Sequence, residues 1–258
     1  MSLIHETALV DPSAQLADDV EVGAFSIIGP KVTIGEGSRI GPHVVVTGRT
    51  TIGKNTRIFQ FASIGDEPQD KKYDGEDTEL IIGDNNMIRE LCTFSRGTSQ
   101  GGGKTIIGNN NWIMACVHIA HDCVLGDNII MANNASLAGH VTVGDWAILS
   151  GYSLIHQFCN VGEHSFTSFA SHVNQSIPPF VTVAGEKAKA KGVNTEGLKR
   201  RGYTAEEIQQ VRRAYKILYR SGLLLEEAKE KLTEMAEEHG EVQPWVDFLN
   251  TTEKSFIR

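Results

Sequence analysis

Four histidines, at positions 118, 121, 140 and 156, lie in a stretch that is otherwise aliphatic, small or turn-forming. An unperturbed imidazole has a pKa of about 6.5, so a histidine can abstract a proton at neutral pH. Asp122 follows His121 directly and could orient its ring. Three imidazoles could also bind zinc. The spacing of the apolar residues fits neither an amphipathic helix nor an alternating strand, so a longer pattern must define the element that holds these histidines.

Aliphatic residues recur at every sixth position over most of the chain. From Ile4 to Ile64 every residue at this spacing is aliphatic, and the phase resumes at Ile82. It then slips by one residue and continues from Ile107 to Val173, where only Thr167 is not apolar. The residue four places after each of these is usually small. So long a run at one period indicates an internal repeat.

A six-residue period predicts a parallel β-helix, and hence a mainly β fold, over residues 1–185. Each hexapeptide would form a short strand and a turn, and three hexapeptides would close an eighteen-residue coil, giving about ten coils up to Pro178. The large aliphatic side chains would stack inside, one coil every ~4.8 Å. The phase breaks at residues 65–81 and 95–106, which we expect to leave the coil as loops, where functional residues often lie.

Residues eighteen apart should lie directly above one another in such a coil. The register then stacks His121 with Gly139, and Asp122 with His140. These positions avoid the inward aliphatic phase, so we expect the histidines to face outward. One corner should therefore gather His121, Gly139, His140, His156 and Gln157 over three coils, with His118 within reach.

The pattern changes after residue 185, and residues 186–258 are predicted to form a helical C-terminal domain that caps the last coils. Thr204 and Glu207 form a capping box, and the apolar stripe that follows ends before Gly222. Further helices are expected at Leu224–His239 and Val242–Thr251.

Composition narrows the classes of function. The net charge is −8, which argues against a nucleic-acid-binding protein. No basic region followed by an apolar run opens the chain, and no window approaches eighteen consecutive apolar residues, so neither a signal peptide nor a membrane span is expected. The four cysteines have no disulfide or CxxC pattern and are interpreted as reduced core residues of a cytoplasmic protein.

Several segments resemble the UDP-N-acetylglucosamine acyltransferase family. They are IAHDC (119–123), LAGHV (137–141), IHQFC (155–159), QFASIG (60–65), QDKKYDGE (69–76) and NTEGLKRRG (194–202). The resemblance covers essentially the whole chain and implies a left-handed β-helix that assembles as a homotrimer. It also implies transfer of an (R)-3-hydroxyacyl chain from acyl carrier protein to the 3-position of UDP-N-acetylglucosamine, the first step of lipid A biosynthesis, without a cofactor or metal.

The same resemblance implies roles for single residues. His121 matches the general base, Gly139 the backbone donor to the oxyanion, and Asp122 would orient the imidazole. The remaining matches are substrate-binding positions: Asp70 and Lys72 in the first loop, which would reach across a subunit boundary; His118, His140, His156 and Gln157 in the pocket; and Asn194, Glu196, Arg200 and Arg201 at the uridine diphosphate.

Three further features concern the substrates. Phe169 matches the position that closes the acyl groove, and its bulk predicts a chain of about ten carbons, (R)-3-hydroxydecanoyl. Residues 187–220 hold ten basic and three acidic residues, a surface suited to an acidic carrier protein. Ser95 stands where the family commonly has histidine, which leaves a 3-amino sugar open as acceptor.

Other classes of function also remain open at this point. They are an acyl-CoA-dependent acyltransferase of the same fold that acts on another sugar nucleotide, a zinc-dependent hydratase and a passive scaffold.

Overall fold

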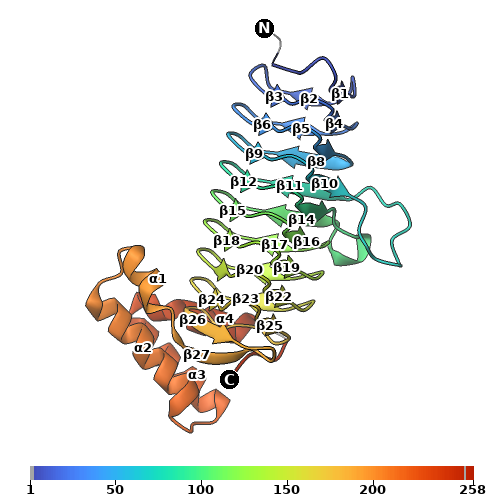
Figure 1. Ribbon diagram of the computed structural model, residues 1–258. Coiled ribbons are helices and arrows are strands. Elements are labelled where there is room, and N and C mark those ends of the chain that lie inside the picture. The colour runs from blue at the N-terminus through green and yellow to red at the C-terminus, as the bar shows by residue number, and fades with distance from the viewer. Residues whose placement is uncertain (1–2, 253) are drawn as a thin grey trace.

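The coil repeat determines the architecture. A computed structural model describes residues 3–252 and 254–258. In it the chain winds into a stack of triangular coils that starts at the N-terminus and ends at a group of helices (Figure 1). Outside the two loops, most paired residues are eighteen apart, as in Leu9 with Ile27 and Ile27 with Val45. The mainly β fold predicted from the six-residue period is therefore confirmed.

The three faces of the coil are three sheets, whose strands are mostly two residues long. The first sheet contains, in spatial order, β1 (Leu9–Val10), β4 (Ile27–Ile28), β7 (Val45–Val46), β10 (Ser63–Asp66), β13 (Thr93–Ser95), β16 (His118–Ile119), β19 (Ser136–Leu137), β22 (Leu154–Ile155) and β25 (His172–Val173). The second contains β2 (Gln15–Leu16), β5 (Thr33–Ile34), β8 (Arg49–Ile52), β11 (Glu79–Ile82), β14 (Lys104–Ile107), β17 (Val124–Leu125), β20 (Thr142–Val143) and β23 (Asn160–Val161).

The third sheet extends into the C-terminal region. It contains β3 (Glu21–Val22), β6 (Arg39–Ile40), β9 (Arg57–Ile58), β12 (Met87–Ile88), β15 (Trp112–Ile113), β18 (Ile130–Met131), β21 (Ile148–Leu149), β24 (Phe166–Thr167), β26 (Val181–Ala184) and β27 (Lys189–Val193). Among the described strand pairs all are parallel except β26 with β27, which is an antiparallel pair that the repeat pattern did not predict.

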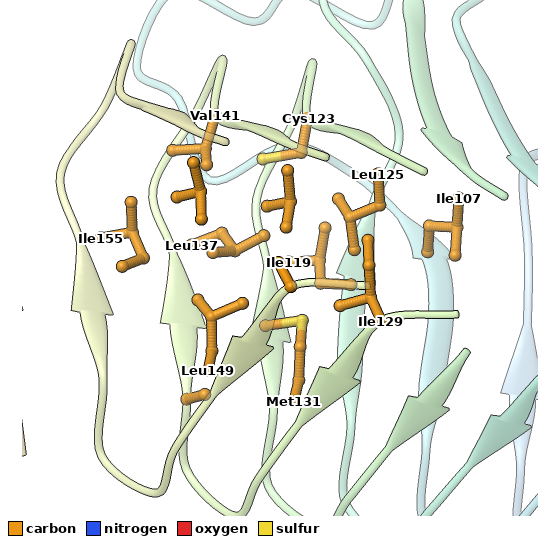
Figure 2. Close-up of a cluster of buried hydrophobic side chains, with 14 of the residues drawn as sticks. Ile107, Ile119, Cys123, Leu125, Ile129, Met131, Leu137, Val141, Leu149 and Ile155 are labelled. Carbon is orange, nitrogen blue, oxygen red and sulfur yellow. The ribbon is translucent and has the colours of Figure 1, made fainter. Parts of the chain in front are cut away.

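The interior is a column of aliphatic side chains. Ile119, Leu137 and Ile155 occupy equivalent positions in successive coils and point inward, and the smaller Cys123 and Val141 fill the space near one corner (Figure 2). Two-residue strands have little stability of their own, so each coil depends on the apolar area that it buries against its neighbours.

The corners require a left-handed backbone at one residue each. Asp122 and His140 have φ of 60° at the corner that follows the first sheet, and Phe25, His43 and Phe61 adopt the same conformation at another corner. A left-handed conformation costs about 1–2 kcal/mol for a residue other than glycine. The rings of Phe25, His43 and Phe61 stack on one another at 5.2 Å, which offsets part of this cost.

Helices follow the last coils. They are α1 (Thr195–Arg200), α2 (Ala205–Arg220), α3 (Leu225–Glu238) and α4 (Gln243–Thr251), with short 3-10 helices at η1 (Ser99–Gly101) and η2 (Gly240–Val242). The capping box of Thr204 and Glu207 begins α2 as predicted. The predicted second and third helices correspond to α3 and α4, whereas α1 was not predicted. None of these helices is long and apolar enough to cross a membrane.

The prediction for the cysteines was wrong at one position. Cys92, Cys123 and Cys159 are buried, and burial raises the pKa of Cys92 and Cys123 to about 12. Cys116 is exposed, because it occupies a left-handed corner position, where the side chain points away from the coil interior. The six-residue pattern defines the inward positions, and Cys116 is not one of them.

The stacked interior predicts a large cost for a cavity. Leu137 is fully buried, so Leu137→Ala should lower the free energy of unfolding by about 2–5 kcal/mol. Leu224 is 72% exposed, and Leu224→Ala should change the free energy of unfolding by less than about 0.5 kcal/mol. Urea denaturation followed by circular dichroism measures both. Equal midpoints for the two variants would contradict the proposed role of coil stacking.

Candidate active site

His121 and Asp122 form a hydrogen-bonded pair at the corner between β16 and β17. His121 Nδ1 lies 2.7 Å from Asp122 Oδ2. The side chain of Asp122 is fully buried, whereas that of His121 is 14% exposed. A carboxylate can only accept, so Nδ1 carries the proton in this pair and Nε2 is left with a free lone pair. This tautomer is the one that a general base requires.

Gly139 lies against the His121 ring, one coil further on. A Cβ at this position would lie 2.6 Å from His121 Cε1 and 2.9 Å from Nε2, so no side chain fits there. Among the described residues no acceptor is found for the Gly139 N–H, although the neighbouring Ala138 and His140 N–H groups bond to carbonyls. An unbonded N–H close to an imidazole can stabilise a developing oxyanion.

Two further histidines border the pair. His140 Nε2 lies 3.6 Å from Asp122 Oδ2, and its ring meets the His121 ring edge-on and stacks on Phe158. His118 Nδ1 lies 2.8 Å from Thr93 Oγ1. Burial lowers the pKa of His118, so this ring is neutral at pH 7. The structure therefore brings together His118, His121, Asp122, Gly139 and His140.

His156 and Gln157 are exposed in the next coil and contact the C-terminal tail. Lys254 Nζ lies 3.1 Å from His156 Nδ1 and 2.6 Å from the Gln157 carbonyl oxygen. Among the described hydrogen bonds, none joins these two residues to His121 or Asp122. They extend the row of polar residues along the corner but are not part of the pair.

The residues matched to uridine diphosphate line a cavity of about 610 Å³ between the third sheet and α1. Asn194 Oδ1 caps α1 through the Gly197 N–H at 3.1 Å. The Arg201 guanidinium donates to the Trp146 carbonyl at 2.7 Å and lies over the Trp146 ring. Asn194 and Arg201 therefore have partners within the fold. Glu196, which is ion-paired with Lys199, and Arg200 line the cavity from an exposed helix face.

Asp70 and Lys72 lie on the first loop, which projects sideways from the coil between β10 and β11 (Figure 1). Asp70 Oδ1 accepts the Lys72 N–H at 3.0 Å, and no hydrogen bond or ion pair within the described residues joins either of them to His121. Within the described part of one chain, no hydrogen bond or ion pair links these two residues to the other candidate site residues.

Phe169 is 69% exposed and lies against the Tyr152 ring, with the two ring centroids 5.6 Å apart. A Cβ on Gly151 would lie 3.2 Å from the Phe169 ring. The side chain thus lies outside the coil interior, where a ligand that runs along the surface would meet it.

One residue of the site was missed by the sequence analysis. Thr98, on the second loop, donates its N–H to Asp122 Oδ1 at 2.8 Å and its hydroxyl to Oδ2 at 2.7 Å. His121, Asp122 and His140 also present possible metal ligands within 4.8 Å of one another. The carboxylate, however, already accepts three hydrogen bonds, so the group is arranged as a hydrogen-bonded network.

A β-helix of hexapeptide coils with a histidine–carboxylate pair at one corner defines a hexapeptide-repeat transferase. Residues 13–48 and 104–139 match the family model "Bacterial transferase hexapeptide (six repeats)", and residues 177–257 match "Udp N-acetylglucosamine O-acyltransferase; Domain 2". The chain is 61% identical over 258 residues to a protein of Thiobacillus denitrificans and 59% identical over 262 residues to one of Herminiimonas arsenicoxydans, with both chains fully covered in each comparison.

Both relatives are named acyl-[acyl-carrier-protein]--UDP-N-acetylglucosamine O-acyltransferase. The solved structure of the Francisella novicida UDP-N-acetylglucosamine acyltransferase superimposes with a TM-score of 0.97 at 46% identity, covering 99% of this chain and 94% of the other. The chain therefore belongs to the UDP-N-acetylglucosamine acyltransferase family and is an acyltransferase.

A pH-dependent contribution to stability comes from His164, which the sequence analysis did not single out. The ring is stacked between Trp146 and Phe180, and burial lowers its pKa to about 4. The folded state therefore favours the neutral ring. The stabilisation that the buried neutral ring gives the folded state is complete above pH 6.5 and is lost as the pH falls towards 4. The free energy of unfolding should be about 2 kcal/mol lower at pH 5 for this reason.

Comparison with His164→Phe isolates this contribution. Phenylalanine occupies the same left-handed corner conformation at Phe25 and Phe61 and cannot be protonated. The thermal midpoint should therefore fall less between pH 7.5 and 5.0 in the variant than in the wild type, while Glu163, whose pKa burial raises, affects both proteins alike. An equal fall in both proteins would show that His164 is not responsible.

Proposed function

We propose that the protein transfers an (R)-3-hydroxyacyl chain from acyl carrier protein to the 3-hydroxyl of UDP-N-acetylglucosamine. The observation that carries this proposal is the His121–Asp122 pair, whose free Nε2 faces the unsubstituted Gly139. The names of the two relatives support acyl carrier protein as the donor and UDP-N-acetylglucosamine as the acceptor. The reaction is the first step of lipid A biosynthesis, takes place in the cytoplasm and uses neither a cofactor nor a metal.

The residues of the corner account for each proton and bond in this reaction. His121 Nε2 removes the proton of the sugar hydroxyl, and the hydroxyl oxygen attacks the carbonyl carbon of the thioester. The Gly139 N–H stabilises the tetrahedral oxyanion. As the intermediate collapses, the carbon–sulfur bond breaks, and the thiolate leaving group takes the proton back from the imidazolium. Asp122 stabilises that imidazolium throughout.

A homotrimer with sites shared between subunits fits the positions of the remaining residues. The His121 corner lies between the first and second sheets, whereas the cavity lined by Glu196 and Arg200 opens on the third sheet. One nucleotide sugar cannot reach both faces of the same convex coil. A neighbouring chain could bring its third-sheet cavity and its Asp70 and Lys72 to this corner.

Two features support the donor and the chain length. The basic residues of 187–220 form a positively charged segment on an acidic protein, as docking of an acidic carrier protein requires. The exposed Phe169 ring, held by Tyr152, would obstruct a groove along the coil surface. Since each buried methylene contributes about 0.8 kcal/mol, loss of room for four of them favours a chain of about ten carbons over fourteen.

The base assignment predicts the effect of His121→Ala. Without a group to remove the hydroxyl proton, kcat should fall by about 10²–10⁴-fold, with an unchanged circular dichroism spectrum. Mass spectrometry of products from mixed acyl donors and both a 3-hydroxyl and a 3-amino acceptor measures turnover and identifies the acceptor. A variant that retains most of its activity would exclude His121 as the base.

The chain-length assignment predicts a change of selectivity in Phe169→Gly. In competition between ten- and fourteen-carbon donors, the wild type should prefer ten carbons and the variant should shift towards fourteen, because removal of the ring lengthens the groove. Phe25→Gly is the control: this exposed ring lies between β3 and β4, at the opposite end of the coil stack (Figure 1), and its loss should leave the donor ratio unchanged. A wild type that prefers fourteen carbons, or a glycine variant with an unchanged ratio, would exclude this role of Phe169.

A further inference from the structure

The second loop reaches the buried carboxylate of the candidate catalytic pair. Thr98 is itself buried and lies between β13 and β14, outside the repeating coil. Its backbone N–H donates to Asp122 Oδ1 at 2.8 Å, and its hydroxyl donates to Oδ2 at 2.7 Å. One residue therefore holds both oxygens of Asp122, which fixes the plane of the carboxylate as well as its position.

The local structure of the loop sets the direction of the Thr98 hydroxyl. Thr98 is the N-cap of η1, and its Oγ1 accepts the Gly101 N–H at 3.2 Å. Its carbonyl oxygen also accepts the Gly103 N–H at 2.8 Å. Because one lone pair of Oγ1 already faces the turn, the hydroxyl proton is left to point at Asp122.

The same turn also packs on the carboxylate through its backbone. A Cβ on Gly101 would lie 2.1–2.4 Å from the carboxylate atoms of Asp122, so the loop backbone packs directly on this group. The loop is in turn tied to the first loop, because Ser99 Oγ donates to Glu76 Oε1 at 2.8 Å and Arg96 donates to the Tyr73 hydroxyl. These contacts with the first loop hold the second loop, and with it Thr98, in place.

The Asp122 carboxylate needs to be held in place because two imidazoles lie near the same oxygen atom, Oδ2. Asp122 Oδ2 lies 2.7 Å from His121 Nδ1 but also 3.6 Å from His140 Nε2. A small rotation of the carboxylate would exchange its hydrogen bond from His121 to His140. The His121 ring would then lose the partner that keeps the proton on Nδ1 and the lone pair on Nε2.

We propose that Thr98 is a positioning residue, which locks the Asp122 carboxylate onto His121 and away from His140. This inference rests on the proposed role of His121 as the base. Thr98 does not touch the reacting atoms, and it acts only through Asp122. Its loss should therefore affect the chemical step, and substrate binding should change little.

The test compares two substitutions in the full-length enzyme. Thr98→Val keeps the branched shape and the backbone N–H but removes the hydroxyl, whereas Thr98→Ser keeps the hydroxyl. A misplacement of about 1 Å can cost about 100-fold in rate, so a smaller misorientation of Asp122 should cost about 10- to 100-fold. We expect such a fall in kcat for Thr98→Val, with KM for both substrates within about twofold of the wild type, and recovery of most of the turnover in Thr98→Ser.

A matched control is Thr33→Val, a threonine on the second sheet near the N-terminal end of the coil, for which no side-chain hydrogen bond is found within the described residues. Its kcat should equal that of the wild type. Thermal midpoints of all variants show whether loss of turnover accompanies loss of fold. Wild-type kcat in Thr98→Val, or a loss in Thr98→Ser as large as in Thr98→Val, overturns the proposal.

A double-mutant comparison shows whether Thr98 acts through Asp122. In an Asp122→Asn background, Thr98→Val should lower kcat by less than about twofold further, because residues that act as a unit are not additive. If the falls in kcat caused by the two substitutions multiply, Thr98 acts independently of Asp122 and the proposal is overturned.

His121→Ala is measured in the same assay. If His121→Ala is inactive while Thr98→Val is fully active, only the positioning role of Thr98 fails. An active His121→Ala overturns the base assignment and the positioning role together.

Discussion

The eighteen-residue register of the coil is the constraint on which the rest of the molecule depends. Strands of two residues cannot persist alone, and each exists because Ile119, Leu137, Ile155 and their counterparts stack in one buried column. A slip of one residue would turn every inward side chain out of the coil. The register is therefore strongly specified, and the left-handed corner residues accept an unfavourable backbone conformation because the column on either side determines it.

The same register also places the residues of the His121 corner next to one another. Stacking places a glycine directly against the His121 ring and a second imidazole beside Asp122. Neither arrangement needs a special loop, because each follows from residues that are eighteen apart. The register alone, however, leaves one carboxylate oxygen between two histidines. Selection between them requires a group from outside the repeat, and the second loop, which brings Thr98 against both oxygens, is such a group.

This division also explains what the sequence could predict. The coil, the contact of His121 with Gly139 and the start of α2 at its capping box follow from period or from local rules, and all three are found in the structure. The contact of Thr98 with Asp122 has no such signal, because a loop inserted in a repeat has no period of its own. The short α1 and the antiparallel β27 were missed for a related reason: β27 is specified by its pairing with β26, and Asn194, which caps α1, is held by the carbonyl of the distant His164. The contact of Arg201 with Trp146 could not be predicted from the sequence either, because the two residues are far apart along the chain.

A solenoid built in this way is convex, and its polar groups face different directions. His121 lies at one corner, the cavity of Glu196 and Arg200 opens on the third sheet, and Asp70 and Lys72 extend from the side on a loop. Regular stacking aligns residues along one edge of the coil, but it cannot bring separate faces of the same coil together. In the proposed homotrimer, packing of one coil against another would bring these faces together, so that the regularity which stabilises a single chain would also make the proposed function depend on assembly.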